Sequence, residues 1–123
     1  MLYVRLAKMH AKPSVRISAM LDTGSSFCLF RADIGRSIGL DIASGIKQAI
    51  HGVVPGAQTH AYFHRVQLYV ESNWIHEISA GFVENFTWGV LLGRRGFFDK
   101  FDIKFSHSTA NPTFEINQIQ VVH

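Results

Sequence analysis

The sequence predicts an all-β fold made of several short strands and one short helix. Apolar and polar residues alternate over several segments, which is the pattern of strands with one buried face. Prolines and glycines separate these segments, most clearly at Lys12-Pro13-Ser14 and at Pro55-Gly56. With 123 residues and 47% hydrophobic content, the chain is expected to form a single domain over residues 1–123.

The first expected strands lie on either side of Asp22 in the sequence. Residues 2–8 and 15–20 alternate between apolar and polar side chains, so both are expected to be strands, and the second leads directly to Asp22. Residues 27–30 are continuously apolar, which favours a short strand covered on both faces. A short helical turn over 31–38 and a loop over 41–47 are expected to follow.

The best hairpin candidate lies in the middle of the chain, where residues 48–54 and 57–70 flank Pro55-Gly56. Symmetric pairing about this dipeptide places His51 opposite His60, and imidazoles so placed would make hairpin movement pH-sensitive. An L-proline at the first turn position favours type I or II geometry, which fits strand twist less well than the primed turns. A wide tip is therefore expected.

The last third of the chain is predicted from apolar runs. Val90-Leu91-Leu92 is fully apolar and stops at Gly93. Phe97, Phe98 and Phe101 stand at helical spacing and predict one short helix over 94–101 whose aromatic side chains face the core. The remaining segments are expected to be strands over 75–82, 102–105 and 113–122, with an irregular aromatic-rich connection over 83–88.

Composition narrows the function classes. The net charge of +3 comes from twelve scattered Lys and Arg, of which only Arg94-Arg95 are adjacent, so no nucleic-acid partner is expected. The one cysteine, Cys28, precludes an internal disulfide framework and is expected to be a small buried hydrophobe in a reducing compartment. No apolar run reaches the roughly 18 residues that a membrane segment needs, so a cytoplasmic location is the default expectation.

Asp22-Thr23-Gly24-Ser25-Ser26 is the candidate chemical site. Apolar segments on both sides deliver a carboxylate to a tight turn of small polar residues, where Gly24 permits close approach of a ligand. The competing interpretation is an aspartate that merely satisfies the backbone of its own turn, since such a triplet also arises by chance.

The order of motifs resembles that of the retroviral-type, or retropepsin-like, aspartic proteases. Asp22-Thr23-Gly24-Ser25 is followed by a central hairpin and then by Leu91-Leu92-Gly93-Arg94. Residues 61–66 and 90–101 resemble the bacterial members of this group in particular. The resemblance covers residues 15–105 and implies a homodimeric acid-protease β-barrel with a flap hairpin and one short C-terminal helix.

The resemblance also implies roles for individual residues. Asp22 would be catalytic, Thr23 would join the two active-site turns across the dimer axis, Gly24 would offer its carbonyl to the substrate backbone, and the Ser25 hydroxyl would bind the catalytic carboxylate. The implied flap and substrate-binding residues are Gly52, Val53, Val54, Pro55 and Gly56, and the implied supporting residues are Leu92, Gly93 and Arg94. The terminal strand would join the dimer interface.

Two positions depart from the family pattern. Many viral members carry a second aspartate two residues after the glycine, which pairs with the arginine after the Leu-Gly run. Here that position is Ser26, so Arg94 is expected to lack its usual partner. The flap tip is also less rich in glycine, which predicts slower flap motion or narrower substrate choice.

A homodimer is also expected on chemical grounds. Amide hydrolysis by carboxylates needs one group that takes a proton from water and another that holds a proton for the carbonyl oxygen. The chain has one Asp-Thr-Gly and no Asp-Ser-Gly that could replace a second. A symmetric pair would place two copies of Asp22 on a two-fold axis, where they share one proton.

The sequence therefore predicts an aspartic endopeptidase that hydrolyses peptide bonds through a homodimeric Asp22 dyad and an activated water. The alternative is a catalytically weak or inactive dimer of the same type that binds extended peptides, and a further alternative is a β-rich interaction domain with a chance triplet. The expected partners are a second copy of the chain and an extended peptide or protein substrate. No cofactor or metal is expected, because no Cys or carboxylate completes a ligand set around His60 and His64.

Overall fold

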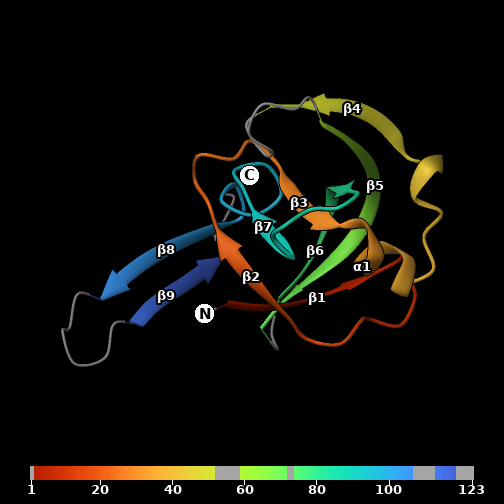
Figure 1. The fold of residues 1–123 in the computed structure, drawn as a ribbon. Helices are drawn as coiled ribbons and strands as arrows, with labels where there is room; N and C mark the ends of the chain where they lie inside the picture. Colours follow the sequence, from red (N-terminus) through yellow and green to blue (C-terminus); the bar gives the residue numbers. More distant parts are fainter. Residues whose placement is uncertain (1, 52–58, 72–73, 107–112, 119–123) are drawn as a thin grey trace, which may run out of the picture.

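The computed structural model describes residues 2–51, 59–71, 74–106 and 113–118, with the backbone alone described for 102–106 and 113–118 (Figure 1). The chain is mostly β-strand. The strands are β1 (Leu2–Ala7), β2 (Ile17–Leu21), β3 (Cys28–Arg31), β4 (Ile46–Ile50), β5 (Thr59–Val70), β6 (Trp74–Val83), β7 (Val90–Leu92), β8 (Phe101–Ser106) and β9 (Thr113–Gln118). The helical elements are α1 (Ala32–Ser37) and the 3-10 turn η1 (Ile42–Ser44).

Six strands close into a barrel, in the order β1-β2-β7-β3-β6-β5, because β1 pairs with β5 as well as with β2. Closure removes the free edges of these six strands. The seventh strand, β4, pairs with β5 outside this circle and forms an edge of the sheet. Strands β8 and β9 form a separate two-stranded arm that extends away from the barrel (Figure 1).

The long strand β5 contributes buried residues to two hydrophobic clusters. Its later residues Val66, Leu68 and Val70 are buried in the barrel core, while Ala61 and Phe63 face a smaller cluster at the opposite end of the strand. The spacing between Phe63 and Val66 shifts the buried side chains from one face of the strand to the other. This change of face creates a second apolar surface beside β4, outside the main core.

Pairs of aromatic rings pack against one another in the core of the barrel. Phe30 and Phe82 lie with ring centroids 5.6 Å apart, and Phe97 stacks on Phe101 at 5.0 Å. All four side chains are almost completely buried. Pairs of this kind contribute about 0.5–1.5 kcal/mol beyond the area they bury.

Most expected strands are confirmed, with small changes of boundary. The predicted strands at 2–8, 27–30, 75–82 and 102–105 and the short helical turn at 31–38 all form. The second strand begins at Ile17 instead of Val15, whose side chain is 81% exposed. The predicted loop over 41–47 was partly wrong, because it contains η1 and the first residues of β4. The predicted last strand begins at Thr113 as expected, and its residues after 118 lie outside the described part of the chain.

The predicted helix over residues 94–101 is wrong. This segment forms irregular turns, in which the N–H groups of Phe98 and Asp99 donate to carbonyls five residues earlier, at 3.1 and 2.9 Å. The α-helix is excluded because Gly96 has φ +102° and its N–H donates to Asp99 Oδ1 at 3.0 Å. The inward direction expected for Phe97 and Phe101 is nevertheless confirmed, since both are buried.

The predicted pairing of His51 with His60 is also wrong. Strands β4 and β5 pair with Ala49 opposite His60 and with Ile50 opposite Thr59, a register two residues away from the expected one. A shift of two residues leaves each side chain on the same face of the strand, so the burial of Ile50 with Ala61 fits both registers and the apolar pattern does not distinguish them. The pH-sensitive histidine pair therefore does not form. Among the described helices, none has the length and apolar character needed to cross a membrane.

His76 on β6 is expected to make the protein less stable in mild acid. Burial lowers the pKa of His76 below its ordinary value, the Lys100 cation acts in the same direction, and Asp99 opposes them. The ring lies edge-on against Phe101, and its Nε2 is buried with no hydrogen-bond partner among the described residues. The unfolded chain therefore binds a proton near pH 6.5 that the folded chain binds only at lower pH.

The free energy of unfolding should thus fall as the pH drops below about 6.5. His76→Phe, which keeps a ring against Phe101, should make this decline shallower in urea titrations at a series of pH values. The control is His10→Asn, at an exposed position with φ 60° that asparagine tolerates. An unchanged slope in His76→Phe would contradict the prediction.

Candidate active site

Asp22 stands where β2 leaves the barrel. Strand β2 runs parallel to β7, with Met20 opposite Leu91 and Leu21 opposite Leu92. The Asp22 N–H continues this pairing by donating to the Leu92 carbonyl at 2.9 Å. The end of β7 therefore fixes the point at which Asp22 leaves the sheet.

The turn after β2 orients the Asp22 side chain. The Gly24 N–H donates to Asp22 Oδ1 at 2.9 Å, and the Ser25 N–H donates to the Asp22 carbonyl at 3.1 Å. The side chain is half-buried. The aspartate does satisfy the backbone of its own turn, as the competing interpretation requires, and the same bond holds the carboxylate in one orientation.

The neighbouring hydroxyls take different positions. Thr23 is exposed on the turn. The Ser25 hydroxyl donates to the Phe27 carbonyl at 2.8 Å, so its single hydrogen is not available to Asp22. The contact expected between Ser25 and the carboxylate is therefore not made, because the turn directs this hydroxyl toward its own backbone.

The residues after β7 lie against the far side of the same turn. The Arg94 and Arg95 N–H groups donate to the carbonyls of Ser25 and Ser26 at 2.9 and 3.0 Å. The intervening Gly93 has no room for a side chain, because a Cβ would lie 2.7 Å from the Ser25 carbonyl oxygen and still closer to that of Phe27. The backbone after β7 thus supports the Asp22 turn directly.

Arg94 has a partner, contrary to the expectation from sequence. Its Nη2 donates to Ser26 Oγ at 3.0 Å. The backbone bonds between the two segments bring serine and arginine close enough for the shorter side chain to reach. A neutral hydroxyl here takes the place of the carboxylate expected at this position.

A groove of about 520 Å³ lies in front of the turn. Strand β4 forms one wall with Gln48, Ala49 and Ile50, and the segments around β7 form another. Asp22 and His51 are the titratable groups among its described lining residues. The remaining lining residues are Gly24, Ser25, Ser26, Phe27, Leu29, Phe86, Trp88 and Leu91.

The described groove and the expected site can be compared only in part. The flap-tip residues Gly52, Val53, Val54, Pro55 and Gly56 lie outside the described residues. Phe86 and Trp88 were not predicted as lining residues. The aromatic content of segment 83–88 was the available signal, since aromatic side chains commonly line ligand pockets.

The other reactive side chains have structural roles. Burial raises the pKa of the Cys28 thiol to about 12, so Cys28 is a buried hydrophobe, as expected, and not a nucleophile. The His64 ring bonds to the Ile42 carbonyl through Nε2 at 2.9 Å. Within the described residues, no three His, Cys, Asp or Glu side chains gather where they could hold a metal ion.

Comparisons with known proteins do not assign this site. No protein-family model matches the sequence, and no curated protein or solved structure matches the chain. The chemistry of the groove must therefore be inferred from its own geometry.

Gly93→Ala should destabilise the protein by about 1–3 kcal/mol, because the added methyl group meets backbone carbonyls that cannot move independently. The measurement is the midpoint and slope of urea unfolding, with labelling of the Cys28 thiol as a local probe, since its Sγ lies 4.0 Å from the Gly93 carbonyl oxygen.

Gly89→Ala is the matched control. A Cβ at Gly89 meets nothing within 4 Å, so this variant should unfold within about 0.5 kcal/mol of the wild type. Equal stability of the two variants would contradict the close approach at Gly93.

Proposed function

We propose that the chain is one protomer of a homodimeric, retropepsin-like aspartic endopeptidase. The observation that carries the proposal is the Asp22 carboxylate, held by the Gly24 N–H at one wall of a groove lined by both polar and apolar residues. The closed barrel, with the β4–β5 pair beside the groove, supports the same class of fold. The turns formed by residues 94–101, where a short helix was expected, distinguish this chain from the expected pattern.

An extended peptide is the substrate that suits the groove. Strand β4 is an edge strand that also lines the groove, so one side of its backbone is not paired to another described strand. Edge strands readily bind an added extended segment through main-chain hydrogen bonds. The peptide would lie between β4 and the Asp22 turn, with its scissile carbonyl at the carboxylate.

The chemistry needs a second protomer. Asp22 is the one carboxylate among the described residues that line the groove. In a symmetric dimer, one Asp22 would take a proton from a water while the other, protonated, donates to the substrate carbonyl oxygen. The oxygen of that water then bonds to the carbonyl carbon, and a proton returns to the amide nitrogen as the carbon–nitrogen bond breaks.

Exposed side chains near the turn support such a dimer. Thr23 is exposed on the turn itself, while Met20 on β2 and Trp88 at the groove are 42% and 46% exposed. Methionine and aromatic side chains are enriched at protein–protein interfaces relative to the rest of the surface. The β8–β9 arm projects from the same barrel and offers further edges for pairing (Figure 1).

A peptide-binding module without hydrolysis is the second candidate. It is favoured by the single carboxylate among the described residues of the groove, because a monomer could bind a peptide but could not divide the two proton transfers. The oligomeric state therefore distinguishes the two candidates.

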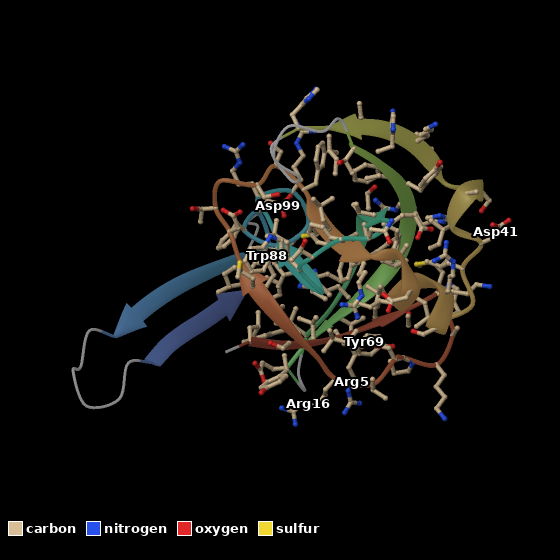
Figure 2. All side chains as sticks on the ribbon, viewed as in Figure 1. Arg5, Arg16, Asp41, Tyr69, Trp88 and Asp99 are labelled. Atoms are coloured by element: carbon tan, nitrogen blue, oxygen red, sulfur yellow. The ribbon has the colours of Figure 1, made fainter. Side chains whose placement is uncertain are left out.

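Asp22→Asn should lower kcat on a cleaved peptide by at least about 10²–10⁴-fold, because an amide cannot take or hold the transferred proton. A diverse peptide pool incubated between acid and neutral pH and read by mass spectrometry would detect cleavage. Asp41→Asn is the control, at an exposed carboxylate next to η1 and not among the groove residues (Figure 2).

Activity per protomer should also rise with protein concentration, in step with dimer formation in light scattering. Equal cleavage by Asp22→Asn and wild type would overturn the peptidase proposal. Binding of peptides by both proteins without cleavage would instead establish the second candidate.

A further inference from the structure

The catalytic groove continues into a second hollow. This hollow has a volume of about 350 Å³ and shares Phe27 and Gln48 with the groove. It extends past the beginning of β4, where Ile46 is 75% exposed, toward β6 and the turns after β7. An extended peptide that follows β4 away from Asp22 would therefore run directly into it.

The charges around this hollow do not cancel. Arg65, Arg95 and Lys100 face Glu77 and Asp99, which leaves one positive charge in excess. Arg65 is engaged with Glu77 at 3.1 Å, and Asp99 Oδ1 accepts the Gly96 N–H at 3.0 Å. Arg95 is exposed and forms no ion pair with any described carboxylate.

Arg95 is held in position for a ligand. Its backbone N–H donates to the Ser26 carbonyl, and it forms a parallel bridge with Phe27. Its guanidinium lies 5.6 Å from the centre of the Phe27 ring. Stacking of this kind leaves the N–H groups at the edge of the guanidinium free to bind a carboxylate with two parallel hydrogen bonds.

We propose that this hollow is a specificity subsite that binds an Asp or Glu side chain of the extended peptide, with Arg95 as the donor. Phe27, Ile46 and Phe63 form apolar walls for the methylene groups of that side chain. The inference rests on the proposed peptidase function and adds to it the class of substrate. Arg95 is a specificity residue in this scheme and takes no part in proton transfer.

Dimer symmetry gives this subsite a second copy. A two-fold axis through the paired Asp22 turns places one such hollow on each side of the scissile bond. The preferred substrates then have acidic residues at equivalent distances before and after the cleaved bond. A substrate with only one of these acidic residues should show part of the increase in kcat/KM.

The test compares peptides that differ at one position. Starting from any peptide cleaved by the wild type, each residue is replaced in turn by Glu, Gln and Lys, and kcat/KM is measured at low and high salt. At one fixed distance from the cleaved bond, the Glu peptide should have a kcat/KM about two- to five-fold above that of the Gln peptide, as expected for an exposed ion pair. This difference in kcat/KM should shrink at high salt. Arg95→Glu should reverse the order so that Lys is preferred.

Arg5→Glu is the matched control, because Arg5 lies on β1, at the opposite side of the view from β4, and lines neither hollow (Figure 2). It should keep the wild-type preference. Cleavage without an acidic preference, or an unchanged preference in Arg95→Glu, would overturn the subsite and leave the peptidase intact.

A binding assay separates the two proposals. Asp22→Asn, titrated with the same fluorescent Glu, Gln and Lys peptides, measures the Arg95 preference without hydrolysis. If Asp22→Asn binds the Glu peptide more tightly than the Gln and Lys peptides, and the wild type cleaves none of them, the subsite is upheld and the peptidase proposal is overturned. No binding of any peptide and no cleavage would overturn both.

Discussion

The backbone pairing between the end of β7 and the turn after β2 is the constraint on which the site depends. The Leu92 carbonyl receives the Asp22 N–H, and the Ser25 carbonyl receives the Arg94 N–H. These two bonds lie on either side of Gly93, whose missing side chain allows the segments to meet. Since they join main-chain atoms, the position of Asp22 follows from the topology of the barrel and depends little on the surrounding side chains.

The same pairing connects the site to the core. Leu92 is completely buried in the barrel, while Leu91, the residue before it, belongs to the smaller cluster beside β4. Strand β7 therefore lies between the two apolar clusters and carries the groove wall on one face. Backbone bonds to a strand of this kind hold the Asp22 turn more precisely than contacts with a loop would, which suits the proposed proton transfers.

The sequence predicted those features that local pattern decides. Alternation identified β1 and β2, and the spacing of Phe97 and Phe101 predicted their burial correctly even though no helix forms around them. Features set by distant contacts were missed. The register of β4 was missed because alternation does not distinguish registers two residues apart, and the bond from Arg94 to Ser26 depends on a pairing between segments far apart in the chain. The motif at Asp22 located the turn but not Phe86 and Trp88, which line the same groove.

The parallel pairing of β2 with β7 also has a consequence for how the molecule is made. Met20 is opposite Leu91, so about 70 residues separate the two halves of this contact, and contacts of such long range form late. On the ribosome, the Asp22 turn stays without its support until β7 has left the exit tunnel. The Asp22 carboxylate therefore reaches its position only after residues 90–92 have been synthesised, so the proposed peptidase site is absent from shorter nascent chains.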